Sequence, residues 1–212
     1  MKKSLFTLST LSALVLVAGV AHADNPSAEL TVIGTLTVPT CTVAAVNDGV
    51  YDVGSNASTL IKPAATTVLN SVTQAWTVTC DATTYLNFTP LDNRAPSRSV
   101  VAATTFGLGN VNTDGKIGYF TAEVKNAKVD AVDSSLFTSN TTTFTPAATA
   151  KMTAGTRTGW ATTAANTQVA GKVFTADITV SPVLASSADM KGAITDTADI
   201  DGSVTLNFSY GI

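Results

Sequence analysis

The sequence has a single histidine, few charged residues and almost no helical periodicity. His22 is the only histidine among 212 residues, and charged residues make up 13% of the chain. Beyond the first residues, no segment approaches the roughly 20 consecutive apolar residues that a membrane-spanning helix needs. Heptad and 3.6-residue patterns are nearly absent, whereas runs of alternating residues recur between Gly, Pro, Asn and Asp. This residue pattern argues against a helical fold and favours an all-β chain.

An N-terminal leader is predicted at the start of the chain. Lys2 and Lys3 precede an apolar run over residues 5–20, and residues 21–23 have the small-x-small form that signal peptidase cuts. The sequence therefore predicts a signal peptide over residues 1–23 and export of the remainder.

The mature chain should begin at Asp24. After removal of 23 residues it keeps 189 of the 212, which fits one domain. The loss of Lys2 and Lys3 changes the net charge from −3 to −5. Such a chain has no basic surplus with which to hold nucleic acid.

Removal of the leader also removes His22, and with it most common catalytic chemistry. Without histidine the mature chain cannot form a Ser-His-Asp or Cys-His nucleophile, or a histidine-ligated zinc or iron site. Serine-lysine and paired-carboxylate mechanisms remain open in principle. However, the sequence has no Ser-x-x-Lys arrangement and no acidic pair flanked by aromatic residues. We therefore predict that the chain is not an enzyme and has no catalytic residue, metal site or cofactor.

Two cysteines, Cys41 and Cys80, remain in the exported chain. An even count in an oxidising compartment indicates a disulfide, and only one pairing is possible. Closing a loop of about 40 residues is worth roughly 4 kcal/mol in the chain-entropy model. Because no Cys-x-x-Cys spacing is present, we predict a structural bridge and not a redox-active pair.

Both ends of the mature chain have strand-like alternation. Residues 30–38 place one set of side chains on a single face, with Thr31, Thr35 and Thr37 on the other: Leu30, Val32, Gly34, Leu36 and Val38. Residues 203–212 do the same with Val204, Leu206, Phe208, Tyr210 and Ile212. We predict a half-buried strand at each end. Chain termini fray unless a sheet holds them, so these two ends should pair with a partner or with the chain itself.

Further strands are predicted between these two ends. They span residues 72–80, 85–91, 99–108, 117–124, 141–145 and 172–183. Residues 112–115, Asn-Thr-Asp-Gly, should form a hairpin turn before the strand that begins at residue 117. No internal repeat or long linker divides the chain, and one antiparallel sandwich is the economical fold.

These residues together resemble the fimbrial pilin subunits of the chaperone-usher pathway. The likeness rests on an exported chain of this size, a glycine seven residues before the first cysteine (Gly34 and Cys41), Cys80 on a strand, and an aromatic residue, Tyr210, near the end of an alternating last strand. It covers both chain ends and the disulfide but says little about residues 90–200. The chain therefore looks like a divergent, fimbrial-like member of that group.

The resemblance implies an immunoglobulin-like (pilin-type) antiparallel β-sandwich that lacks its last strand. In such subunits a periplasmic chaperone fills the open groove, and at the outer-membrane usher the N-terminal strand of the next subunit replaces it. Residues 24–40 would be the donor-strand extension and residues 41–212 the pilin-like domain. The implied donor residues are Leu30, Val32, Leu36 and Val38 around Gly34, and the implied groove wall comprises Val204, Leu206, Phe208 and Tyr210.

Three functions are compatible with the sequence. The first is a polymerising subunit of a surface fimbria, whose partners are neighbouring subunits, a periplasmic chaperone and an outer-membrane usher. The second is an adhesin or other binding module on the same scaffold, with a host or surface receptor as partner. The third is a periplasmic sandwich that is complete by itself, in which residues 30–38 are the first strand and Gly34 is a bulge.

Overall fold

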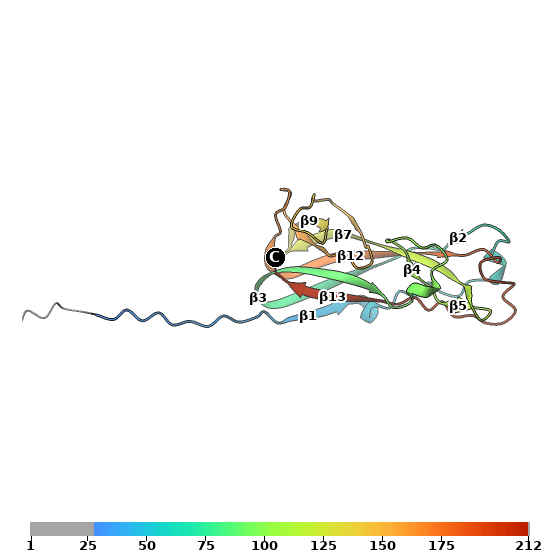
Figure 1. Ribbon diagram of the computed structural model, residues 1–212, viewed down its shortest axis with the longest axis horizontal. Coiled ribbons are helices and arrows are strands. Elements are labelled where there is room, and N and C mark those ends of the chain that lie inside the picture. Colours follow the sequence, from blue (N-terminus) through green and yellow to red (C-terminus); the bar gives the residue numbers. More distant parts are fainter. Residues whose placement is uncertain (1–27, 212) are drawn as a thin grey trace, which may run out of the picture. The chain divides into compact units, whose positions relative to one another are not determined.

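The computed structural model describes residues 28–211, in two units that meet between Thr37 and Val38 (Figure 1). The predicted signal peptide, residues 1–23, the predicted start at Asp24 and the last residue, Ile212, lie outside the described residues. Across residues 28–211, no helix has the length and apolar character needed to cross a membrane.

The body of the protein is built almost entirely from antiparallel strands. It has no α-helix among the described residues and three short 3-10 helices: η1 (Val46–Gly49), η2 (Ser58–Leu60) and η3 (Ala95–Ser97). The strands are β1 (Cys41–Ala45), β2 (Thr67–Val68), β3 (Val72–Asp92), β4 (Phe106–Gly107), β5 (Asn110–Val111), β6 (Gly115–Lys116), β7 (Gly118–Val129), β8 (Val132–Asp133), β9 (Ser135–Thr138), β10 (Ala150–Lys151), β11 (Thr158–Ala161), β12 (Ala170–Leu184) and β13 (Val204–Tyr210).

The long strand β3 joins two layers of one curled sheet. Its first half pairs with β1 on one side and β12 on the other, and β12 continues to β7 and β10. Its second half pairs with β13 and β11, and β11 continues to β9. Between Thr79 and Thr84 the pairing with β12 shifts register. An irregularity of this kind bends a strand, and it lets β3 pass from one layer to the other (Figure 1).

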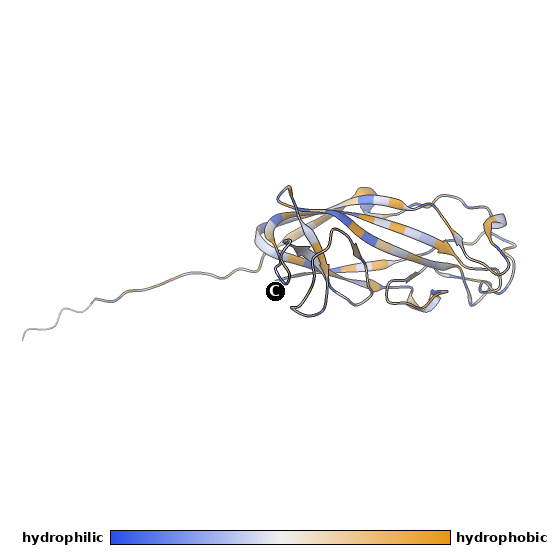
Figure 2. Ribbon diagram, turned by 90° about the horizontal axis from the view of Figure 1, so that it is seen from above, coloured by the Kyte–Doolittle hydropathy of each residue, from blue (hydrophilic) through white to orange (hydrophobic). Residues whose placement is uncertain are grey.

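The hydrophobic core lies between these two layers. The largest fully buried side chains are Phe88, Phe106, Phe137, Phe174, Leu86, Leu136 and Met190. Trp160 packs edge-on against Phe174 at 5.3 Å between ring centroids and against Phe88 at 6.3 Å. Figure 2 shows hydrophilic and hydrophobic residues alternating along the long strands, as expected when one face of each strand meets the core.

The predicted disulfide and the predicted all-β, sandwich-like fold are confirmed. Cys41 on β1 and Cys80 on β3 face each other in register, 4.0 Å apart between Cα atoms, and are bonded. Predicted strands 72–80 and 85–91 are the two halves of β3. The predictions at 117–124, 172–183 and 203–212 correspond to β7, β12 and β13, and the turn at residues 112–115 joins β5 to β6.

Two predicted strands are wrong. Residues 99–108 contain only the two-residue β4, and residues 141–145 contain no strand. Thr105 illustrates the reason, because its hydroxyl bonds the carbonyls of Val100 and Ala102 and so stabilises a loop. Threonine is common in both strands and loops, and alternation with threonine does not distinguish them. Residues 30–38 form no strand within the described chain, where their backbone has no partner, and their pairing with another chain stays a prediction.

Loss of the disulfide should destabilise the body substantially. The bridge closes a sequence separation of 39 residues, so the double variant Cys41→Ala, Cys80→Ala should lose about 4 kcal/mol of unfolding free energy. Urea unfolding of the oxidised protein and the variant measures this difference. Thiol titration of the denatured, unreduced protein should find no free cysteine, and two free thiols would contradict the assignment.

Candidate functional site

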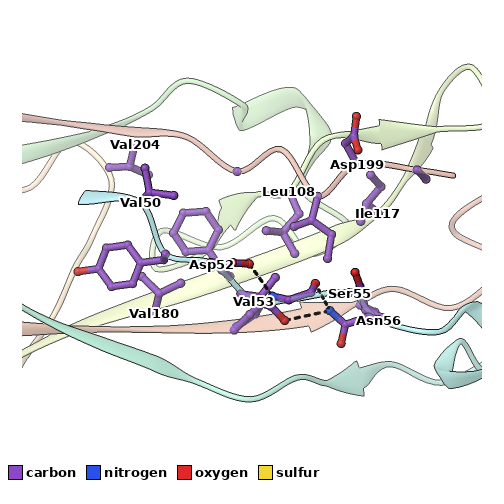
Figure 3. Close-up of a pocket in the computed structure, with 18 of the residues that line it drawn as sticks. Val50, Asp52, Val53, Ser55, Asn56, Leu108, Ile117, Val180, Asp199 and Val204 are labelled. Atoms are coloured by element: carbon purple, nitrogen blue, oxygen red, sulfur yellow. Dashed lines mark hydrogen bonds between the residues drawn. The ribbon is translucent and has the colours of Figure 1, made fainter. Parts of the chain in front are cut away.

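An apolar groove of about 1050 Å³ opens on the body. Two stretches line it: residues 49–58, which we call the first wall, and residues 194–204, which we call the second wall and which run into β13 at Val204. Strands β7 and β12 supply Phe120, Ala122, Ile178, Val180, Pro182 and Leu184. Figure 3 shows Val50 and Val204 toward one end of the groove, and Asn56 and Asp199 toward the other.

Most of the backbone in both walls makes no hydrogen bond to another part of the backbone. Among the described residues, positions 51–56 and 194–200 make no backbone–backbone hydrogen bond. In the first wall, side chains supply some of the missing hydrogen bonds. Asp52 Oδ1 accepts from the Gly54 amide at 2.7 Å, and Asn56 donates to the Val53 carbonyl at 3.2 Å (Figure 3). Extended backbone with free donors and acceptors beside an apolar groove is an edge at which another strand can pair.

Strand β13 adds a second free edge. It pairs with β3 from Val204 opposite Asp92 to Tyr210 opposite Leu86, and within residues 28–211 it has no strand on its other side. Central strands of a sandwich normally pair on both sides. The layer that contains β13 therefore ends with an open row of hydrogen-bonding groups.

Side chains hold the first wall in place where no strand pairing does. Gln74 on β3 donates to the Val50 carbonyl at 2.6 Å. Trp76 Nε1 donates to the Tyr51 hydroxyl at 2.9 Å, and Tyr51 donates to the Ile178 carbonyl at 3.2 Å. Partial burial raises the pKa of Tyr51, although the Trp76 hydrogen bond opposes this shift. The hydroxyl therefore keeps its proton and remains a donor at neutral pH.

The second wall is fixed at the end that leads into β13. Arg94 binds Asp201 through Nε at 2.9 Å and Nη2 at 2.6 Å, and the Asp201 amide donates to the Leu108 carbonyl. Gly202 lies so close to β7 that a Cβ atom there would be 2.9 Å from Phe120 Cε1. These contacts position the start of β13 and leave residues 194–200 free.

The predicted groove residues on β13 occupy different environments. Val204 and Leu206 line the groove. Phe208 is half-buried and packs against Phe88 at 5.6 Å between ring centroids. Tyr210 is 41% exposed and is not part of the groove lining.

The predicted donor residues lie in residues 28–40, which we call the N-terminal segment, and they are exposed. Leu30, Val32, Leu36 and Val38 are each at least 78% exposed, and residues 28–40 belong to no strand. A Cβ atom on Gly34 would have no neighbour within 4 Å, so nothing in the chain itself requires glycine there.

The charged residues that line the groove are all acidic. They are Asp52, Asp196 and Asp199, and no lysine or arginine of the described residues lines it. An apolar floor with acidic side chains at its margin suits a peptide segment and repels the phosphates of nucleic acid.

The sequence patterns did not predict the two walls of the groove. Neither stretch has period-two alternation, and residues 194–204 are rich in aspartate. One indirect signal was present: no strand was predicted between residues 38 and 72. A structureless stretch of that length is unusual within a compact domain and points to a functional segment.

Comparisons with known proteins add little on function. Residues 30–117 match a family described as "Protein of unknown function (DUF1120)". A comparison with curated proteins finds no match for this chain.

Substitution of Tyr51 by phenylalanine should loosen the first wall. The variant loses a hydroxyl that both accepts and donates a hydrogen bond, which costs about 1 kcal/mol of unfolding free energy. Because the folded-state pKa is raised, this contribution is present below the unfolded pKa of about 10 and is lost as pH rises through the folded pKa. Denaturant unfolding of the wild type and the variant from pH 6 to pH 11 measures it. Tyr85→Phe, at an exposed position, is the control and should show no such difference.

Proposed function

We propose that this chain is a structural subunit of a surface fimbria that polymerises by donor-strand exchange. The exposed N-terminal segment of one copy enters the groove of the next and completes its sheet. One observation carries the proposal: an apolar groove, whose walls have no backbone partner over residues 51–56 and 194–200, lies beside β13, which has a free edge in the described chain.

The N-terminal segment has the chemistry that such a groove would accept. Its apolar face comprises Leu30, Val32, Leu36 and Val38, which are exposed in the isolated chain. Residues 30–38 extend over nine positions, and the first wall, residues 49–58, extends over ten. A strand of that length matches the wall to within one residue, and its backbone can pair with free groups along the groove.

Gly34 supports the same reading. Glycine inside a strand is unfavourable unless something approaches it closely, and no atom of residues 28–211 does so at Gly34. A neighbour's groove that is shallow at one point supplies a reason for glycine in the middle of an otherwise bulky face.

The proposed partners follow from the resemblance to chaperone-usher pilins. An exposed groove of this size in a secreted chain invites aggregation, so it needs a temporary cover before assembly. A periplasmic chaperone would provide that cover, and an outer-membrane usher would exchange it for the next subunit at the cell surface. The alternative of a self-complete sandwich is less well supported because it leaves the open groove and the exposed apolar segment unexplained.

A charge on the inward face of the segment should block assembly. Leu36→Asp would place an unpaired carboxylate in an apolar groove, which costs several kcal/mol at each joint. We expect loss of fibres or oligomers in size-exclusion chromatography and electron microscopy. The unfolding free energy of the monomer should stay within about 0.5 kcal/mol of wild type, since residues 28–37 form a unit separate from the body.

Thr35→Asp is the matched control for this experiment. It introduces the same charge one position away, on the opposite face of the predicted strand, where it would meet solvent. The control should assemble like the wild type. Normal assembly by Leu36→Asp would refute donor-strand exchange, and loss of monomer stability in that variant would favour the self-complete sandwich.

A further inference from the structure

We propose that the outer face of the layer formed by β1, the first half of β3, β12 and β7 docks against the same face of a second copy of this chain. None of the residues on this face lines the groove, and the inference does not rest on the proposed function. Three features carry it: the face has short side chains, some of its hydroxyls are bonded to one another, and its charges match themselves under a two-fold rotation.

The strand register arranges the outward side chains of this face in rows that cross the strands. Their neighbours along each strand, among them Val78, Phe174 and Val124, are buried in the core, so the residues of the rows point away from it. In strand order, the first row is Thr73, Thr179, Glu123 and Lys151; the middle row is Ala75, Asp177 and Lys125; and the last row is Ala44, Thr77, Thr175, Lys128 and Asp133.

The side chains over β1, β3 and β12 are short, and several of their hydroxyls already have a partner. The Thr73 and Thr179 hydroxyls are hydrogen-bonded at 2.8 Å, and beside them the Ser71 and Ser181 hydroxyls are bonded at the same distance. Burial of a hydroxyl is costly mainly when the group loses its hydrogen bonds. A second surface can therefore cover this part of the face at a low desolvation cost.

The charges of the three rows are balanced and form neighbouring pairs. The acidic and basic partners are Glu123 with Lys151, Asp177 with Lys125, and Asp133 with Lys128. The rows are thus neutral, whereas the chain as a whole carries an excess of acidic residues. The two outer rows have opposite order: strand β7 supplies the acidic residue of the first row and the basic residue of the last row.

This order makes the face complementary to itself. A two-fold axis along the middle row places the first row of each copy over the last row of the other. Glu123 then lies over Lys128 of the other copy, and Lys151 lies over Asp133 of the other copy. Because a two-fold contact uses the same patch on both copies, each of these opposite-charge contacts occurs twice.

The middle row lies on the axis itself, where Asp177 of one copy meets Asp177 of the other. Each of these carboxylates has Lys125 beside it in register and accepts a hydrogen bond from Asn126 Nδ2 at 2.7 Å. The middle row therefore presents no net charge that would repel the second copy.

The size of the face predicts a weak contact between single subunits. One further row on either side makes five rows. With rows about 6.8 Å apart on four strands about 4.8 Å apart, the face covers roughly 500 Å² per copy, against about 800 Å² in a standard interface. In fibres of the proposed kind the face would repeat along the fibre, and repeated weak contacts would hold two fibres together.

Charge reversal in the two outer rows tests the inference. The reference chain lacks residues 1–23 and carries Leu36→Asp, which keeps the proposed donor out of the groove. It is compared by analytical ultracentrifugation with the same chain carrying either Glu123→Lys or Lys128→Glu. Glu29→Lys is the matched control, because it makes the same charge change at an exposed position outside the face.

We expect the reference chain and the Glu29→Lys control to dimerise with the same affinity. Each reversal should weaken the dimer at least about tenfold, since it sets like charges over each other at two places. An equimolar mixture of the two reversed variants should regain dimers within about threefold of the reference affinity, because one copy then presents two positive charges where the other presents two negative ones. This recovery would also show that both variants are folded.

Three outcomes would overturn the inference. The first is a reference chain that stays monomeric up to about 1 mM, a concentration at which even an interface worth about 4 kcal/mol is populated. The second is a reversed variant that dimerises as tightly as the reference, which would place the contact elsewhere. The third is a mixture that stays monomeric. None of them bears on donor-strand exchange, which uses the groove and not this face.

Discussion

The two layers of the body share one core, but the edge between β13 and the first wall has no strand to close it. An antiparallel sandwich is stable when each layer covers the apolar face of the other and each strand edge is paired or protected. Here the core side of β7 and β12, including Phe120 and Ile178, faces an open groove. The unpaired stretches of the walls and the free edge of β13 adjoin this groove, and in the proposed function the exposed N-terminal segment of another copy pairs there.

The open side of the sheet would close over the groove unless contacts held the two walls apart. In this chain side chains do so at both walls. Tyr51 and Trp76 link the first wall to β12 through a relay of hydrogen bonds that ends at the Ile178 carbonyl. Arg94 and Asp201 fix the second wall where it enters β13. The backbone between these anchors remains unpaired in an organised groove, so a partner of the proposed kind would lose less ordering entropy on binding.

The strands that face a core on one side were predictable. β7, β12 and β13 have period-two patterns that match their burial, and the disulfide followed from two cysteines in a chain predicted to be exported. The patterns failed where threonine-rich alternation occurs in loops, as at residues 99–105 and 141–145. The patterns also predicted no strand at residues 158–161, yet Trp160 lies in β11 and packs against two core phenylalanines. Its burial depends on Phe88 and Phe174, which are distant in sequence.

The sequence by itself determined the class of fold, the single disulfide and the apolar face of the N-terminal segment, because periodicity and cysteine count depend only on local order along the chain. Only the tertiary structure decided that residues 30–38 have no partner within the described chain. It also decided that residues 51–56 and 194–200 line a groove without backbone hydrogen bonds of their own. A strand exists only where another backbone supplies hydrogen bonds, and that supply depends on long-range register. In this chain β1 and β13 each pair with β3 and with no other strand of the described residues.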